Sequence, residues 1–201
     1  MFNPLDKTNL GKSVVDALLE EPARPLSNLA AFKGAGIYAI YYHGDHEAYA
    51  PLVRINKKAA THPIYVGKAI PAGGRKGLSA DASAHSSALC NRLREHADSL
   101  QCVPALDLGH FSCRHLVVDD IRIPLAESLM IQRYRPLWNL VVEGFGNHDP
   151  GSGRYGGQRP LWDVMHPGRS WAEKCATAKY TIDEISAMIS SHLKELRKQS
   201  G

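Results

Sequence analysis

The 201-residue chain is 44% apolar and carries a formal net charge of +4, so it can build one domain with its own core and needs no second. No stretch approaches the roughly 18 apolar residues of a membrane span, and the amino terminus lacks a basic region followed by an apolar segment. The four cysteines form no Cys-x-x-Cys pair, which argues against a zinc ribbon or a disulfide framework, so we expect reduced thiols and a cytoplasmic protein without membrane contacts.

The first predicted elements are one helix and two strands. Apolar residues share one face of a helix over residues 10–20, which Pro22 ends: Leu10, Val14, Ala17 and Leu18. Apolar, β-branched and aromatic runs at Gly36–Tyr42 and Pro63–Val66 predict two strands. The connection over residues 43–62 is expected to be a long loop, either functional or mobile.

The middle of the chain adds a second helix, a strand and a third helix. After a glycine-rich loop over residues 71–77, Leu89, Arg92 and His96 recur at a spacing that places them on one helix face. A strand near residues 110–118 and a helix near residues 124–134 follow. These elements predict a small α/β (α+β) sandwich with a short, mainly antiparallel sheet flanked by helices.

The last third of the chain is rich in turn-forming residues and in arginine, asparagine and glutamine. Such side chains can read base edges, so Arg154, Gln158 and Arg159 are candidate DNA contacts, although a plain loop explains the composition equally well. The residues Thr181-Ile182-Asp183-Glu184 have capping-box spacing and start a predicted helix. Its apolar face, like that of the first helix, either covers the sheet or contacts a second subunit, and comprises Ile182, Ile185, Ile189, Leu193 and Leu196.

Basic side chains concentrate in residues 51–100, where eight basic minus three acidic residues leave +5. A phosphate backbone would favour such a concentration, because each neutralised phosphate releases condensed counterions. For the charges alone, a solvated surface is the more ordinary explanation. The candidate DNA contacts in this region are Arg54, Lys57, Lys58, Arg75 and Lys76.

Two aromatic-apolar-glycine triplets are the most informative motifs. Gly36-Ile37-Tyr38 lies in the first predicted strand and Tyr65-Val66-Gly67 in the second, and they are followed in order by Arg92, His96, Glu127 and Asn139. Singly, these are ordinary strand aromatics, helix-surface residues or a turn residue. The ordered set resembles the GIY-YIG nuclease superfamily, whose two triplets precede a helix with Arg and often His, a metal-binding Glu and an Asn.

The resemblance implies hydrolysis of a phosphodiester, with Tyr38, Tyr65, Arg92, His96, Glu127 and Asn139 as the catalytic set and Lys68 in support. Glu127 would bind one Mg²⁺ per active site, Arg92 would neutralise the phosphate, and Tyr38 would be the general base. Tyr65 would hydrogen-bond the water or the phosphate, and Asn139 would orient a neighbour. A free phenol is about three pKa units too weak at neutral pH, so positive charge from Lys68, Arg92 or the metal must lower its pKa, or His96 must relay the proton.

Within the superfamily the chain is similar to compact type II restriction endonucleases. The stretches at residues 148–151, 162–169 and 170–172 resemble those of the subgroup that cuts the palindrome CCGCGG. The resemblance implies a catalytic core over residues 33–140, an N-terminal helical extension over 1–32 and a C-terminal DNA-recognition or assembly extension over 141–201. It also implies cleavage of double-stranded DNA at a GC-rich site without a nucleotide cofactor, by a homodimer, because a two-fold protein reads a palindrome.

Three other functions are compatible with parts of the sequence. One is a nicking or repair-type nuclease on the same scaffold, and another is a noncatalytic DNA-binding module, which missing catalytic side chains would favour. All of those side chains are present. The third, a zinc-containing His-Asn-His nuclease, would use Asn147, His148 and His166, but the histidine and cysteine spacings provide no ββα metal unit.

Overall fold

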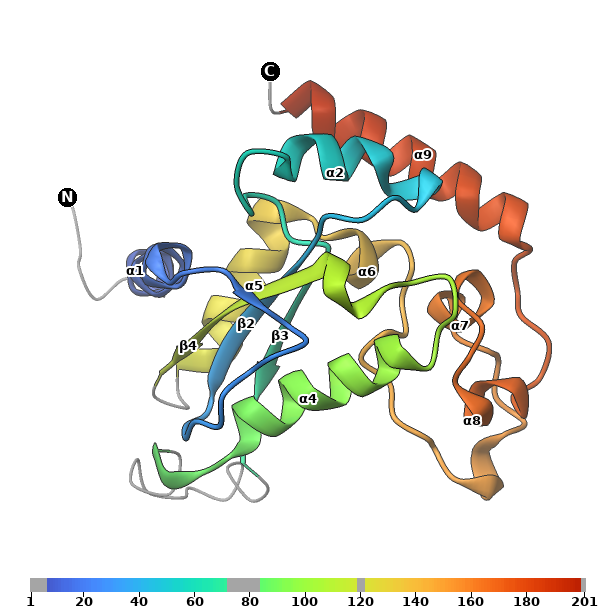
Figure 1. Ribbon diagram of the computed structural model, residues 1–201, viewed down its shortest axis with the longest axis horizontal. Helices are drawn as coiled ribbons and strands as arrows, with labels where there is room; N and C mark the ends of the chain where they lie inside the picture. Colours follow the sequence, from blue (N-terminus) through green and yellow to red (C-terminus); the bar gives the residue numbers. More distant parts are fainter. Residues whose placement is uncertain (1–6, 72–83, 119–121, 200–201) are drawn as a thin grey trace.

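Four antiparallel strands form the centre of the computed structural model, which describes residues 7–71, 84–118 and 122–199 (Figure 1). The strand order is β1-β4-β2-β3, and β2 pairs along its whole length with β4. This sheet, with helices on both of its faces, confirms the predicted α/β sandwich. The strands are β1 (Arg24–Pro25), β2 (Gly36–Tyr42), β3 (Tyr65–Ala69) and β4 (Phe111–Val117).

Helices occupy much of the remaining chain, and within the described residues none is long and apolar enough to cross a membrane. The helices are α1 (Lys7–Glu20), η1 (Glu47–Tyr49), α2 (Ala50–Asn56), α4 (Ala88–Gln101), η3 (Leu108–His110), α5 (Ile123–Tyr134), α6 (Leu137–Leu140), η5 (Ser152–Arg154), α7 (Leu161–Met165), α8 (Ser170–Glu173) and α9 (Ile182–Gln199).

Strand β2 is buried over its whole length and divides the core into two clusters. Side chains alternate along a strand, so Tyr38, Ile40 and Tyr42 enter one cluster while Ile37 and Tyr41 enter the other. The first cluster is shared with α4, α6 and α9, and the second with α1 and α5. The sheet therefore separates the helix that carries Arg92 from the helix that carries Glu127.

The two terminal helices bury their apolar faces within the protein. On α1, Val14, Val15 and Leu18 are buried against the cluster that includes α5; the side chain of Leu10 lies outside the described residues. On α9 the buried apolar residues are Ile185, Ile189, Leu193 and Leu196, all in the cluster shared with α4. Of the two alternatives for these apolar faces, packing on the sheet and contact with a second subunit, the structure therefore supports packing on the sheet.

The start of α9 confirms the capping box and corrects one residue of the predicted face. Glu184 Oε2 accepts from the Thr181 backbone nitrogen at 2.8 Å, and the Glu184 nitrogen donates to Thr181 Oγ1 at 3.3 Å. The prediction that Ile182 belongs to the apolar face is wrong, because its side chain is 53% exposed. Ile182 is the first residue of the helix, one turn before the buried residues begin.

The expected loop over residues 43–62 instead contains η1 and α2, and that prediction is wrong. Pro51 lies in the first turn of α2, where its missing N–H costs no hydrogen bond. Tyr49 and Leu52 are buried three residues apart. Asn56 then fixes the return to the sheet, because its Oδ1 accepts from the backbone nitrogens of Thr61 at 3.1 Å and His62 at 2.8 Å.

Candidate active site

The glycines of the two triplets allow close packing in the sheet. A Cβ on Gly36 would lie 2.0 Å from the carbonyl oxygen of Leu116, and a Cβ on Gly67 would lie 2.3 Å from the phenol oxygen of Tyr38. Tyr38 pairs directly with Gly67 across the strands, so the ring crosses over that glycine. The second triplet therefore needs glycine in order to leave room for the tyrosine of the first.

Tyr38 and His96 form a buried hydrogen-bonded pair. The phenol oxygen lies 2.6 Å from His96 Nε2, and both side chains are 1% exposed. Burial raises the pKa of Tyr38 well above its ordinary value and lowers the pKa of His96 well below its own. Both shifts favour the uncharged forms, so in the DNA-free protein a neutral phenol is hydrogen-bonded to a neutral imidazole, and Tyr38 is the donor when the imidazole carries its hydrogen on Nδ1.

The electrostatic expectation for Tyr38 is only partly met. Arg92 lowers the pKa of Tyr38, as the sequence suggested, but burial raises it by more, and Tyr65 raises it further. Lys68 is instead engaged in an ion pair with Glu127. The nearby positive charge of the DNA-free protein is therefore not enough to lower the pKa of Tyr38. The phenol proton needs an acceptor, and His96, which is hydrogen-bonded to the phenol, can be that acceptor.

Tyr65 and Arg92 complete the cluster around His96. The rings of Tyr65 and His96 lie 5.2 Å apart, and Phe145 stacks on His96 with ring centres 4.5 Å apart. Arg92, on α4, donates to the carbonyl oxygen of Gly146 at 2.5 Å and also contacts Glu95 and His148. The catalytic arginine expected from the sequence is thus held against the 144–148 segment, beside the two tyrosines.

Glu127 and Lys68 meet on the other face of the sheet. Lys68, near the end of β3, places its Nζ 2.7 Å from Glu127 Oε2 on α5, and the Glu127 side chain is 20% exposed. The negative charge of Glu127 raises the pKa values of Tyr38 and Tyr65, which shows that the carboxylate acts across β3 on the tyrosine cluster. All six predicted catalytic residues therefore lie around one strand.

The donor set at Glu127 fits a hard divalent cation with a mostly open coordination shell. The described residues contain no group of three or more histidine, cysteine or acidic side chains able to hold a metal. Magnesium is commonly bound by one or two carboxylates together with waters and substrate phosphates. Glu127 is a partly exposed carboxylate paired with a half-exposed lysine, so it suits that mode and would not suit a closed zinc site.

Asn139 orients a neighbour, and that neighbour is strand β3. Its Oδ1 accepts from the Val66 nitrogen and its Nδ2 donates to the Val66 oxygen, both at 2.8 Å. Val66 stands between Tyr65 and Gly67, so the side-chain amide fixes the backbone that carries the second triplet. Asn139 lies at the edge of the sheet and acts on the site through this strand.

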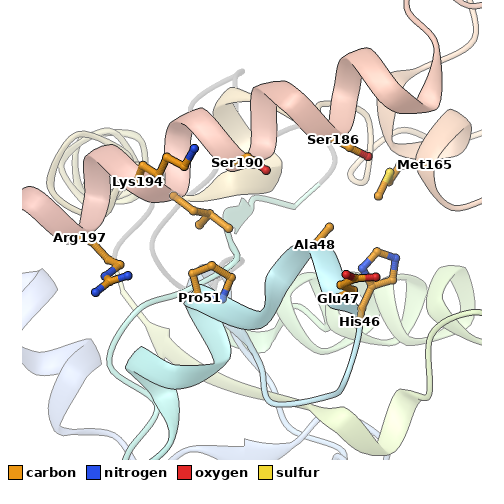
Figure 2. A pocket seen from close by; sticks show the side chains of 10 residues that line it. His46, Glu47, Ala48, Pro51, Met165, Ser186, Ser190, Lys194 and Arg197 are labelled. Carbon is orange, nitrogen blue, oxygen red and sulfur yellow. The ribbon is translucent and has the colours of Figure 1, made fainter.

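The predicted DNA contacts of residues 54–58 lie away from this cluster. Arg54, Lys57 and Lys58 are exposed on α2 and just after it, next to α9 and on the opposite side of the protein from α4 (Figure 1). A cleft of about 550 Å³ between η1 and α9 is lined by Glu47, Lys194 and eight further residues (Figure 2). None of the predicted catalytic residues lines it.

A second cleft, of about 520 Å³, adjoins Arg92. Gly146 and His148, which contact Arg92, line it together with Arg154 and Gln158. Arg159, in contrast, is used inside the protein, where its guanidinium donates to the carbonyl oxygens of Ala172 at 3.0 Å and Glu173 at 3.1 Å. The predicted contacts Arg75 and Lys76 lie outside the described residues.

Sequence reasoning missed the partners of Arg92. The sequence suggests a zinc ligand or part of a tail motif for His148 and a turn-rich segment for Gly146 and Phe145, yet all three contact Arg92 or His96. These contacts join residues more than 45 positions apart, and no local pattern reports them. The glycine-rich composition of residues 144–151 was the available signal that a backbone approaches other groups closely there.

Comparison with known proteins identifies the family. A family model described as the Eco29kI GIY-YIG domain matches residues 30–193, which is most of the chain. No curated protein matches the chain. The matched region includes both triplets, the helix with Arg92, the Glu127 helix and the tail that holds the 144–148 segment.

Proposed function

Because the chain belongs to the Eco29kI GIY-YIG family and is thus a GIY-YIG nuclease, we propose that it is a type II restriction endonuclease. Its substrate is double-stranded DNA, and its target is a short GC-rich palindrome. The observation that carries the proposal is the convergence of Tyr38, Tyr65, Arg92 and His96 on one face of the sheet with Glu127 just across β3. A binding module would not need a buried tyrosine–histidine pair beside an arginine and a carboxylate.

The proton path begins at the attacking water. Tyr38 accepts a proton from that water while its own phenol proton passes to His96 Nε2, 2.6 Å away. The neutral imidazole is ready to accept, because burial keeps its pKa low. The new O–P bond forms as the 3′ oxygen leaves, and Arg92 offsets the negative charge that develops on the phosphoryl oxygens.

Glu127 would hold one Mg²⁺ at the edge of the cluster. A bound divalent cation supplies neutralisation of the phosphate and stabilisation of the leaving oxygen. Lys68 is the counter-ion of Glu127 in the DNA-free protein, and its amino group is free to move to a phosphate when the carboxylate takes another partner. Tyr65 is placed to hydrogen-bond the water or the phosphate.

The second cleft is the part of the protein best suited to reading bases. It begins at the residues that hold Arg92, so DNA with a phosphate at Arg92 passes next to it. Arg154 and Gln158 are exposed at its edge, and Asp149 also lines it. Arginine donates two hydrogen bonds to guanine and a carboxylate accepts from cytosine, which supports a GC-rich target such as CCGCGG.

Cleavage of both strands of a palindrome calls for two active sites related by a two-fold axis. Each chain brings together one set of the predicted catalytic residues around the Tyr38–His96 pair, so a homodimer on the DNA would place one site on each strand. A nicking or repair-type nuclease on this scaffold remains the second candidate, and the single active site of the monomer is the feature that favours it.

The deciding experiment is the incubation of purified protein with unmethylated plasmid DNA rich in GC palindromes, with Mg²⁺ and with EDTA. Discrete Mg²⁺-dependent fragments support a restriction endonuclease and allow the target to be mapped from the ends. Nicked circles alone favour the nicking enzyme. Tight binding without cleavage in any metal would favour the noncatalytic module.

Substitution of Glu127 separates binding from chemistry. We expect Glu127→Ala to abolish cleavage and to leave DNA binding within a few-fold of the wild type, because the carboxylate serves the cation and not the DNA backbone. Glu195→Ala is the matched control, since Glu195 is an exposed acid on α9, away from β3. Retained cleavage in Glu127→Ala would remove this residue from the metal role.

A further inference from the structure

The segment over residues 162–169, first noted for its resemblance to a restriction-enzyme tail, folds around a buried ion pair. Arg169 Nε donates to Asp163 Oδ1 at 2.6 Å and its Nη2 donates to Oδ2 at 2.5 Å. The two residues are only 4% and 2% exposed. The rings of Trp162 and Trp171 lie 4.6 and 4.8 Å from the guanidinium carbon, so Arg169 is confined from both sides.

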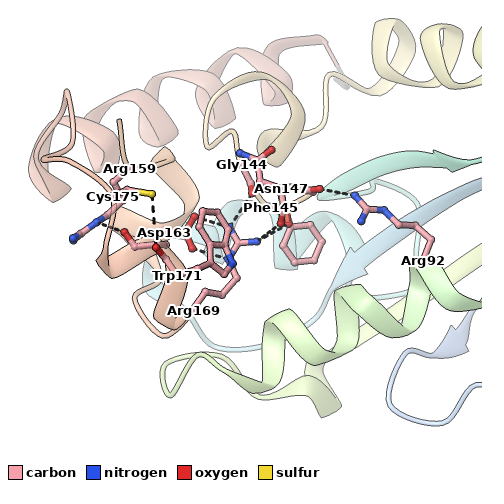
Figure 3. Close-up of polar contacts among 11 residues, drawn as sticks. Arg92, Gly144, Phe145, Asn147, Arg159, Asp163, Arg169, Trp171 and Cys175 are labelled. Atoms are coloured by element: carbon pink, nitrogen blue, oxygen red, sulfur yellow. Dashed lines mark hydrogen bonds and ion pairs between the residues drawn. The ribbon is translucent and has the colours of Figure 1, made fainter. Parts of the chain in front are cut away.

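The remaining donors of Arg169 bind the backbone beside the catalytic cluster. They reach the carbonyl oxygens of Gly144 at 2.9 Å, Phe145 at 3.1 Å and Asn147 at 3.0 Å. Within the same four residues, the carbonyl of Gly146 instead accepts from Arg92. Figure 3 shows the two arginines approaching this short segment from opposite sides.

This arrangement connects a buried ion pair to both halves of the catalytic machinery. Gly146 holds the guanidinium of Arg92, and Phe145 stacks on His96. The segment forms a turn, in which the Asn147 nitrogen donates to the Gly144 carbonyl at 3.0 Å, and the three carbonyls that Arg169 binds fasten this turn to residues 162–169. A guanidinium offers five donors in a fixed plane, which an ammonium cannot reproduce.

We propose that Arg169 is a positioning residue for Arg92, acting through residues 144–147, and that residues 162–169 serve the chemical step instead of reading DNA bases. This proposal rests on the proposed nuclease function only for its kinetic readout. A base-reading residue would face solvent in the free protein, whereas Asp163 and Arg169 are enclosed and fully paired with each other and with the backbone.

The kinetic test is a double-mutant cycle between Arg92→Lys and Arg169→Lys, measured as single-turnover cleavage of bound DNA at saturating Mg²⁺. Arg169→Lys should slow cleavage by about 10- to 100-fold, because displacement of a catalytic group by about 1 Å costs that much. In the Arg92→Lys background the same change should have little further effect. DNA binding should change far less than the rate does.

Arg114→Lys is the matched control. Arg114 is partly buried and, like Arg169, donates to backbone carbonyls, those of Glu21 and Ala60. It lies over the ring of Tyr41 on the other face of the sheet. The Arg114→Lys substitution should lower thermal stability about as much as Arg169→Lys does. Its effect on cleavage should be small and should add to the effect of Arg92→Lys. Additive effects for Arg169 as well would overturn the proposal.

A second readout does not depend on cleavage. In ¹⁵N-labelled protein without DNA, the Nε–Hε signal of Arg92, assigned by its loss in Arg92→Lys, should shift in Arg169→Lys and stay in place in Arg114→Lys. If the wild type fails to cut DNA, the nuclease proposal fails and this signal still tests the positioning. If Arg169→Lys does not fold, Asp163→Asn replaces it in both experiments, and an unshifted Arg92 signal would contradict the role.

Discussion

Replacing Gly67 with alanine tests whether the second triplet exists to make room for Tyr38. The new Cβ would lie 2.3 Å from the phenol oxygen, whereas ordinary contacts begin at 3.4 Å, so one of the two must move by roughly 1 Å. Tyr38 is fully enclosed and bound to His96 at 2.6 Å, so that movement stretches the tyrosine–histidine pair or displaces β3. Either result should reduce single-turnover cleavage about 100-fold.

The same substitution should cost about 1–3 kcal/mol of stability, the usual range for overpacking. Gly153→Ala is the control, because its Cβ would meet nothing within 4 Å and, like Gly67, it has no left-handed φ. The assay is cleavage of bound DNA started by Mg²⁺, with thermal melting of each variant alongside. Wild-type cleavage by Gly67→Ala would refute the view that Tyr38 must occupy this position.

Three further predictions concern stability and metal binding. Burial lowers the pKa of His166 to about 3. Below about pH 6.5 this histidine therefore binds a proton in the unfolded chain but not in the folded protein, and its contribution to the free energy of unfolding should fall by about 1.4 kcal/mol for each pH unit. Urea unfolding should therefore show a shallower loss between about pH 6.5 and pH 5 in His166→Gln than in the wild type; equal slopes would contradict the assignment. Asn139→Ala should cost about 1–3 kcal/mol in chemical denaturation, because the N–H and C=O of Val66 lose their partner. Lys68→Met should tighten Mg²⁺ binding by about two- to fivefold in calorimetry without DNA, because Glu127 loses a competing ion pair; a weakened affinity would indicate that Lys68 supports the metal site.

Local patterns in the sequence predicted those parts of the fold whose cause is itself local. The bounds of β2 match the predicted strand, because seven consecutive apolar residues bounded by turns leave few other solutions. The start of α9 was equally readable from Thr181 and Glu184. Strand β1 was missed, since two residues that include Pro25 carry no strand pattern and pair only because β4 lies beside them.

The candidate site was predictable as a list of residues but not as a set of contacts. Resemblance to a family placed Tyr38 and His96 in one site, and their hydrogen bond then followed from β2 packing on α4. The burial that raises the pKa of Tyr38 depends on side chains from the whole core, so the composition of the chain does not predict it. The contacts of Arg169 with residues 144–147 could not be predicted from the sequence either, because they are made to backbone carbonyls, which every residue type has.

The side-chain amide of Asn139 also determines how this protein can associate with other chains. β3 lies at the edge of the sheet, and the outward N–H and C=O of Val66 would otherwise be available to a strand from another molecule. The side-chain amide of Asn139 makes the two hydrogen bonds that a peptide group of another strand would make with Val66. The backbone nitrogen of Trp138 likewise donates to the carbonyl oxygen of Ile64. A strand from a second copy therefore finds no free backbone group at Val66, so this part of the sheet edge, beside the predicted catalytic residues, is closed to sheet extension.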